Sequence, residues 1–314
     1  MIKIVCVLLS MLVLIQAKDI KPSFSLHTKG IISDFVVEGE RLYVSTDLGR
    51  IDIFDLKTKK RIEQIVLEPI KSTRNTMVPA SISSVDVFKS KLLIVSRGLD
   101  NYRNVWIYED YKLKKIIGTT KKLLIKEAHF KDGNMLVFAS IDGDISLYDR
   151  NEKASVYTHH VTDSRLSDMV LSSDKKKIII ADESGEVKMF DSTTAKQFPD
   201  IPAKNVDNIF NISHSNGTTI TGGQDRRVVV YQENEKPYYL KSNFFIYSVG
   251  LSPSGKIGAY SDGEDSDIQV FDINTKQKLK HLVGHTKIIR KIHFISENRL
   301  ISSDQGHDIF FWEF

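Results

Sequence analysis

The chain has 314 residues, of which 41% are hydrophobic and 27% are charged. This balance is that of an ordinary folded protein, and it excludes a disordered, collagen-like or multi-spanning membrane protein. Lysine and arginine number 44 against 40 aspartates and glutamates, and this net charge of +4 is too small to indicate nucleic-acid binding.

The first 17 residues have the pattern of an export signal. Lys3 precedes the twelve-residue, mainly apolar run from Ile4 to Ile15, and Ala17 precedes two charged residues. Such a run is too short for a helix to span a bilayer, and a small residue suits a signal peptidase. We therefore expect cleavage after Ala17, a mature domain over 18–314 without a stable membrane anchor, and a periplasmic location. A retained N-terminal anchor is the alternative.

The single cysteine, Cys6, lies inside this predicted signal. It comes too early, and without a Leu-x-x-Cys context, for the cleavage of a lipoprotein. After cleavage the domain has no thiol, so packing must stabilise it without disulfides or thiolate-bound metals.

One seven-residue motif recurs seven times along the chain. Its second and fourth residues are apolar, its fifth is aromatic, and its sixth is an acid or an amide. The aromatic residues are Phe54, Tyr108, Tyr148, Phe190, Tyr231, Phe271 and Trp312. Their spacings of 54, 40, 42, 41, 40 and 41 residues show that the chain is an array of similar units.

Each unit has the signals of several β-strands. A β-rich run that ends in Gly or Asp turn residues precedes the motif, as in Arg41–Gly49. Another apolar run lies upstream, as in Ile32–Val37, and a further one follows the motif, as in Lys60–Leu67. Four short antiparallel strands, repeated seven times, predict an all-β fold, the seven-bladed β-propeller.

The repeats resemble the WD40 family. Gly284-His285, followed by Asp304 and Trp312, is similar to the Gly-His and Trp-Asp ends of its repeat. In the other units Phe or Tyr replaces Trp, and the Gly-His pair is missing. The resemblance covers residues 24–314 and implies that His285 hydrogen-bonds Asp304 and a strand hydroxyl such as Ser302, in a network that orients Trp312.

The last motif leaves the final blade without a fourth strand. An open edge would expose unpaired backbone groups. The segment Pro22–Gly30 has the length of one spare strand and precedes the first unit. We predict that Phe24–Thr28 pairs with the blade that contains Trp312 and so closes the ring.

Histidines and carboxylates in the chain do not form a recognisable metal site. We expect His159-His160 in a loop between blades. Zinc needs about four convergent ligands, and the spacing of the remaining histidines does not supply them. The hairpin Asp262–Asp267 has alternating carboxylates, like a calcium loop, but lacks the twelve-residue register, which favours a polar hairpin tip.

No motif of an enzyme or cofactor site occurs. Gly222-Gly223 lacks the Lys-Ser of a phosphate loop, and two tryptophans, Trp106 and Trp312, are too few for a quinone-dependent propeller. We predict a non-catalytic protein without a cofactor. A propeller hydrolase or quinoprotein with a site at the central channel is one alternative. An outer-membrane assembly scaffold is another, although it would usually carry a lipid anchor.

The one long interval between motifs indicates where function lies. It contains the insertion Leu67–Pro79 and a lengthened hairpin, Arg97–Asn104. In a propeller, both segments open onto the same face. We predict that this face binds a protein partner through basic side chains, namely Lys71, Arg74, Arg97, Arg103, Arg226 and Arg227, with Lys121 and Lys122 nearby. An acidic sector on the sixth unit, formed by Asp262, Glu264, Asp265 and Asp267, would help to orient that partner.

Two segments, Ser45–Leu56 and Ser83–Asp110, resemble the accessory propellers encoded with periplasmic nitrate reductases. Those proteins have a short signal, seven degenerate blades and an expanded first-to-second connection. The resemblance implies an assisting role in nitrate respiration, in maturation, assembly or electron transfer, with reductase components as partners.

Overall fold

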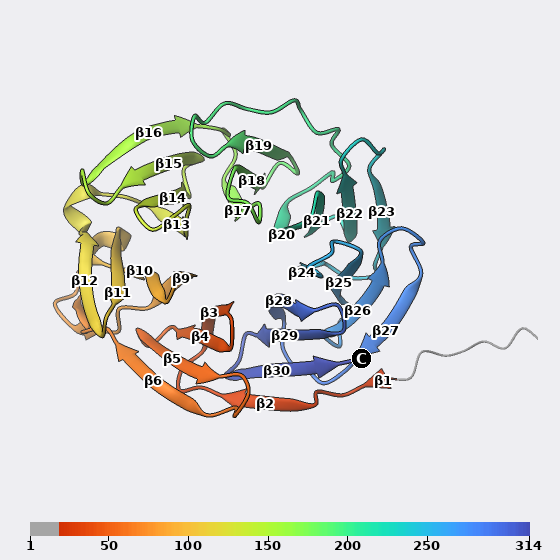
Figure 1. Ribbon diagram of the computed structural model, residues 1–314, viewed down its shortest axis with the longest axis horizontal. Coiled ribbons are helices and arrows are strands. Elements are labelled where there is room, and N and C mark those ends of the chain that lie inside the picture. Colours follow the sequence, from red (N-terminus) through yellow and green to blue (C-terminus); the bar gives the residue numbers. More distant parts are fainter. Residues whose placement is uncertain (1–18) are drawn as a thin grey trace, which may run out of the picture.

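The computed structural model of the protein describes residues 19–314. The predicted signal and Cys6 lie outside the described residues. Seven β-sheets are arranged around a central axis, as Figure 1 shows, so the chain forms the predicted seven-bladed, WD40-like β-propeller. We number the blades in chain order, from the sheet that begins at Ile32.

Within each blade, the first strand in the chain lies nearest the axis and the later strands follow outward in order. Blades 1 to 3 consist of β3 (Ile32–Glu38), β4 (Arg41–Thr46), β5 (Arg50–Asp55) and β6 (Arg61–Val66); β9 (Ile82–Phe88), β10 (Lys91–Arg97), β11 (Arg103–Glu109) and β12 (Lys112–Ile117); and β13 (Ile125–Phe130), β14 (Met135–Ser140), β15 (Asp144–Asp149) and β16 (Ala154–His160).

Blades 4 to 7 continue the array. They consist of β17 (Leu166–Leu171), β18 (Lys177–Asp182) and β19 (Val187–Asp191); β20 (Ile209–Ser215), β21 (Thr218–Gly223), β22 (Arg227–Gln232) and β23 (Tyr238–Lys241); β24 (Val249–Leu251), β25 (Ile257–Asp262), β26 (Asp267–Asp272) and β27 (Lys278–Leu282); and β28 (Ile289–Ser296), β29 (Arg299–Asp304) and β30 (Asp308–Glu313). Among residues 19–314, no helix is long and apolar enough to cross a membrane.

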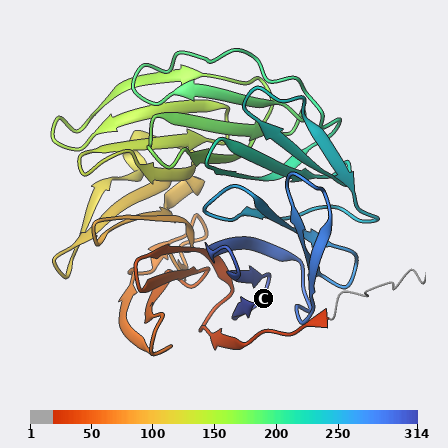
Figure 2. The same ribbon diagram turned by 45° about the vertical axis from the view of Figure 1, so that its right-hand side comes forward.

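The ring is closed by a strand from the other end of the chain. Strand β2 (Phe24–His27) pairs antiparallel with β30, Phe24 opposite Phe311 and His27 opposite Asp308. The amide of Thr28 extends the ladder, donating to the carbonyl of His307 at 2.8 Å. Figure 2 shows β2 lying beside the last blade. The predicted closure by Phe24–Thr28 is confirmed.

A second N-terminal strand was not predicted. Strand β1 (Asp19–Ile20) adds in parallel to β27, the outer strand of blade 6, with Asp19 opposite His281. The Asp19 carboxylate and the His281 ring are 2.9 Å apart, and Ile20 packs on the core between blades 6 and 7. The segment before blade 1 therefore joins two blades rather than one.

Blade 4 departs from the predicted four strands, because its sheet has three. Beyond β19 the chain makes one isolated bridge, between Phe190 and Gln197, and the amide of Phe198 donates to Met189 at 2.9 Å. Pro199 and Pro202 follow, and proline has no N–H to continue a ladder. A fourth strand therefore does not form there.

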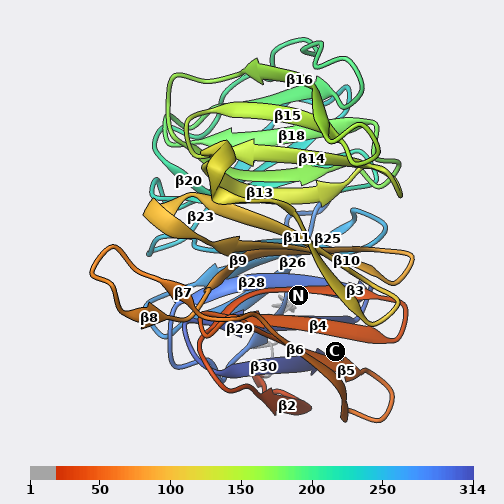
Figure 3. The same cartoon turned by 90° about the vertical axis from the view of Figure 1, so that its left-hand side faces the viewer.

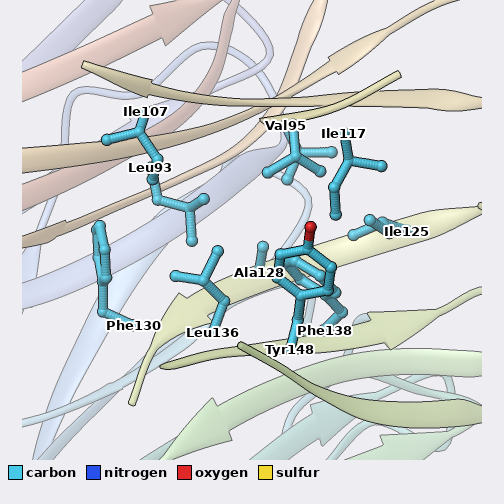
Figure 4. Packing of buried hydrophobic residues seen from close by; sticks show 11 residues of the cluster. Leu93, Val95, Ile107, Ile117, Ile125, Ala128, Phe130, Leu136, Phe138 and Tyr148 are labelled. Carbon is cyan, nitrogen blue, oxygen red and sulfur yellow. The ribbon is translucent and has the colours of Figure 1, made fainter. Parts of the chain in front are cut away.

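The hydrophobic core lies between blades. Figure 4 shows Leu93, Val95 and Ile107 of blade 2 facing Phe130, Leu136 and Phe138 of blade 3, and all six side chains are buried. Each such side chain contributes about 1.5–3 kcal/mol by leaving water. Because similar clusters fill the other gaps, each blade depends on both of its neighbours.

The hydrogen bonds implied by the WD40 resemblance surround Trp312. His285 contacts Asp304 at 3.0 Å and Ser302 at 2.7 Å, and the Trp312 indole donates to the Ser302 hydroxyl at 2.7 Å. Blade 5 has a counterpart in which Asn205 takes the place of the histidine. The amide oxygen of Asn205 accepts from Thr221 at 2.7 Å and from Tyr231 at 3.2 Å.

Replacing Leu26 by alanine tests the closure. Leu26 is the buried residue of β2, and it packs in the cluster between blades 7 and 1. Leu26→Ala should lower the free energy of unfolding by about 2–4 kcal/mol, because it leaves a cavity at the closure. Urea denaturation should still give one transition, since the blades depend on one another. Ser25→Ala, at the adjacent exposed position, is the control, and equal midpoints for the two variants would contradict closure by β2.

Candidate functional site: the connection face and the channel mouth

The blade-to-blade connections and the hairpins between the second and third strands share one side of the ring, which we call the connection face. Three contacts establish this. The insertion lines a hollow with the β10–β11 hairpin, the amide of Arg103 donates to Leu123 in the next connection, and Arg227 donates to Lys204 in another. The sequence-predicted basic residues therefore lie on one face, although around different blades.

The insertion forms a small hairpin of its own. Strands β7 (Ile70–Lys71) and β8 (Met77–Val78) pair antiparallel, and the Ser72 amide donates to Thr76 at 2.8 Å. Figure 3 shows this hairpin extending away from the blades. Ile70 packs on the core between blades 1 and 2, which fixes the base of the hairpin.

Arg97 and Arg103 end β10 and begin β11, directly opposite each other in the ladder. Antiparallel partners have Cβ atoms about 4.5–5.5 Å apart, so two like charges there repel. The arginine ion pairs within residues 19–314 are those of Arg50, Arg61 and Arg150. The Arg97–Arg103 pair therefore has no carboxylate partner in the described part of the chain.

Arg103 is the more enclosed of the two. It donates through Nη1 to the carbonyl of Asn101, while its Nε is buried without a hydrogen-bond partner among the described residues. Burial, and then the charge of Arg97, lower the pKa of Arg103 from its usual value. The guanidinium is thus held where its positive charge is poorly compensated.

A hollow of about 180 Å³ lies beside this pair, lined by Ser81, Ser83, Arg97, Asn101 and Arg103. Ser83 belongs to β9, the innermost strand of blade 2, so the hollow adjoins the channel. A smaller hollow of about 70 Å³ lies between Arg97 and the insertion, and Lys71, Ser72 and Asp100 help to line it. The structure thus brings Lys71, Arg97 and Arg103 together, while Arg74 is exposed on the insertion.

The loop that carries the pair is tightly built. A Cβ at Gly98 would lie 2.2 Å from Thr119 Cγ2 and 2.9 Å from Asn104 Nδ2. The loop packs there against the connection to blade 3, where η2 (Thr119–Lys121) lies. Asp100 and Asn101 adopt left-handed φ angles of 54° and 64° within the turn η1 (Leu99–Asn101). Such packing holds the arginines in place.

The two arginines of blade 5 are not part of this group. Figure 1 shows blade 5 across the central channel from blade 2. Arg227 lies over the Tyr239 ring at 4.5 Å, and Arg226 lies 5.9 Å from the Phe245 ring. Lys121 and Lys122, by contrast, are exposed in the connection that follows blade 2.

The acidic sector of blade 6 is partly compensated within the blade. Asp262 lies 3.5 Å from Lys278, and Asp267 lies 3.1 Å from His281, while Glu264 and Asp265 are exposed at the tip. Burial raises the pKa of Asp267. Within residues 19–314, no group of three or more His, Cys, Asp or Glu side chains is placed to hold a metal ion.

The expectation that His159-His160 lie in a loop is wrong. Both residues end β16, the outer strand of blade 3, where they pair with Ile145 and Asp144. The His160 ring contacts Asp144 at 2.8 Å and Asp163 at 3.3 Å, and these hydrogen bonds, Asp144 first, raise the pKa of His160. The signal for this strand was the run of β-branched and aromatic residues Val156, Tyr157 and Thr158.

A belt of polar side chains that sequence analysis missed surrounds the channel. In six blades, the second residue after the buried apolar residue that opens the inner strand is polar; in blade 6 the corresponding apolar residue, Ile246, lies just before β24. These belt residues are Asp34, Ser84, Glu127, Asp168, Asn211, Ser248 and Lys291. The signal was available as an Ile-x-polar or Leu-x-polar pattern at the start of each unit.

The belt residues bond one blade to the next. Five of them accept the backbone N–H of the following inner strand, at 2.8–3.3 Å; the donors are Val85, Ala128, Met169, Ile212 and Val249. Lys291 joins blade 7 to blade 1 by donating to Asp34 at 2.7 Å. Between blades 6 and 7, the buried Ser248 hydroxyl has no partner among the described residues.

Charges in the belt are unequally compensated. Burial, and then the charge of Asp168, raise the pKa of Glu127 well above its usual value. Burial opposes the charge of Lys291, but Asp34 outweighs it and the pKa of Lys291 is raised. Nearby, burial lowers the pKa of His293 to about 4, so this ring is neutral near pH 7. Glu127 is thus the carboxyl group that retains its proton most readily.

Four aromatic rings gather across the channel mouth from the arginine pair, and these too were missed. Phe210 and Tyr247 stack at 5.3 Å with an interplanar angle of 8°. Phe244 and Phe245, from the connection between blades 5 and 6, pack against Tyr247 at 6.3 and 6.2 Å. All four rings are partly exposed. The signal was the aromatic run in Asn243–Tyr247.

Comparison of the chain with protein-family models and with curated proteins finds no match. The geometry of the connection face and of the belt is therefore the basis for a functional proposal.

Replacing Glu127 by glutamine tests the belt through pH. A raised native pKa means that the folded state binds a proton that the unfolded chain releases above about pH 4.5. The contribution of Glu127 to wild-type stability should therefore fall as pH rises toward its native pKa, by up to about 1.4 kcal/mol per pH unit. Glu127→Gln resembles the protonated acid and should remove this slope.

Urea denaturation at pH 5, 6, 7 and 8 measures the difference between variant and wild type. The gain in stability from Glu127→Gln should grow with pH, whereas Glu264→Gln, at an exposed hairpin tip, should show no such trend. A constant difference for Glu127→Gln would mean that Glu127 is ionised throughout.

Proposed function

We propose that the protein is an exported, non-catalytic propeller that binds another protein on its connection face. The observation that carries this proposal is the cationic group of Lys71, Arg97 and Arg103 where the insertion meets blade 2, in which the two arginines contact no carboxylate within residues 19–314. The insertion that lengthens the first repeat interval and the lengthened β10–β11 hairpin meet there. Loops on a rigid scaffold are the usual location of binding residues.

The opposite side of the channel mouth supports the same proposal with different chemistry. The partly exposed rings of Phe210, Phe244, Phe245 and Tyr247 offer apolar surface beside Arg226. Aromatic and arginine side chains are enriched where protein partners contribute most of their binding energy. A partner with acidic side chains at one end and apolar side chains at the other would fit this face.

For the identity of the partner we propose a component of periplasmic nitrate respiration, whose maturation, assembly or electron transfer the propeller assists. The basis is the resemblance carried by Ser45–Leu56 and Ser83–Asp110. The second of these segments covers β9, β10 and β11, and so includes the hairpin that carries Arg97 and Arg103.

A channel enzyme is the second candidate, because the belt places Glu127 and Asp168 at the axis. Both carboxylates, however, accept backbone N–H groups of the next blade. Their positions are therefore accounted for by the bonding of the ring, and the protein-binding proposal explains more of the connection face.

Charge reversal on the insertion tests the proposal. Affinity capture from a periplasmic extract should recover a partner with the wild-type protein and at least tenfold less with Lys71→Glu/Arg74→Glu, because opposite charge would repel an acidic partner. Lys57→Glu/Lys60→Glu is the matched control. These exposed lysines lie in the β5–β6 hairpin of blade 1, which opens on the other face.

Recovery of nitrate reductase components would support the finer proposal, and recovery of other periplasmic proteins would replace it. Equal recovery with both double variants would contradict binding through the connection face.

A further inference from the structure

The hollow beside Arg97 and Arg103 has the chemistry of an anion site. Arg97 and Arg103 form the last pair of the β10–β11 ladder and both line the hollow, and the remaining lining groups, Ser81, Ser83 and Asn101, are neutral and polar. We infer that this hollow binds the carboxylate of an acidic side chain presented by a partner protein. The inference rests on the proposed function for its ligand, but not for the existence of the site.

Repulsion between the arginines indicates that something is missing from the pair. Like charges directly opposite in a ladder destabilise a hairpin. Arg50 and Arg61, by contrast, both contact Asp52 at 3.3 Å, and what sets Arg97 and Arg103 apart from other arginines without an ion pair is that they lie directly opposite each other. The chain places no carboxylate in contact with Arg97 or Arg103 within residues 19–314. A bound anion would convert this repulsion into two charge-assisted hydrogen bonds.

The donors are already arranged for such a ligand. Arg103 Nη1 donates to the Asn101 carbonyl, which fixes the guanidinium where Arg103 lines the hollow beside Arg97. A guanidinium that is fixed in this way binds a carboxylate with little loss of side-chain freedom. The left-handed turn at Asp100 and Asn101, together with the close contact of Gly98 with Thr119, holds the loop before any ligand arrives.

The hollow is open to solvent and has room for the proposed ligand. One water needs at least about 10–15 Å³ of such accessible space, so about 180 Å³ holds a carboxylate with its waters. Arg97 is exposed at the rim, which allows the rest of the ligand to extend outward. This arrangement suits a side chain projecting from a larger partner. The carboxylate of Asp100, on the adjoining smaller hollow, disfavours a doubly charged phosphate.

Thermal unfolding with small probes tests the inference on the whole protein. Glutarate, inorganic phosphate and chloride are compared at equal ionic strength. Glutarate at ten times its Kd should raise Tm by about 2 °C over chloride. Arg97→Met and Arg103→Lys should abolish that rise, the latter because lysine keeps the charge but loses the planar fork. Arg226→Met, across the channel mouth, should keep it.

The variants and the probes together distinguish loss of the site from loss of folding. Arg97 is exposed, so Arg97→Met should fold normally in chloride even if Arg103→Lys does not. A rise with phosphate and none with glutarate would contradict the carboxylate assignment. A rise with neither, or one that survives Arg97→Met, would exclude an anion site there, whatever the capture experiment shows. Loss of partner capture by Lys71→Glu/Arg74→Glu without loss of the glutarate effect by Arg97→Met would likewise contradict the site.

Failure of the proposed function is distinguishable from failure of the site. If glutarate binds as expected while wild-type protein captures no partner, the anion site stands and the protein-binding proposal is contradicted.

Discussion

A propeller has no common core, and this constraint governs the rest of the molecule. The apolar clusters lie between neighbouring blades, so each blade is stable only with both neighbours in place. Six of the seven gaps join blades that follow one another in the chain. The seventh, between blades 7 and 1, must be joined by residues far apart in sequence, and β2 does this by pairing with β30. That pairing makes a linear array of sheets into a ring.

The belt residues around the channel also make each blade depend on its neighbours, at the inner edge of the ring. Side chains of one inner strand accept N–H groups of the next, which fixes the height of each blade relative to its neighbour. Where blade 7 meets blade 1, Lys291 donates instead of accepting, and Asp34 receives it. The closure is therefore made twice, by strand pairing at the rim and by an ion pair at the axis. This rigid frame leaves the connection face free to vary.

Sequence periodicity predicted the blade number and the closure because strand pattern and repeat length are local properties. It also located the enlarged connection that meets the Arg97 hairpin. Periodicity did not predict the contacts between segments that are far apart in the sequence. The parallel pairing of β1 depends on where blade 6 lies, and the three-stranded blade 4 depends on the prolines after Phe198. Arg226 and Arg227 share the connection face with Arg97, but repeat position alone did not show that their blade lies across the channel from blade 2. The aromatic run at Phe244 was visible in the sequence, but only the structure shows that it forms a cluster with Phe210.

Native-state hydrogen exchange tests the central claim, that pairing of β2 with β30 holds the whole ring together. In low concentrations of urea, amides of β2 and Thr28 that are bonded to blade 7 should exchange in the same global opening as those of β21, on the far side of the ring. Exchange of the β2 segment through a separate opening of low free energy, with blades 1 and 7 still protected, would show that the ring does not depend on this strand.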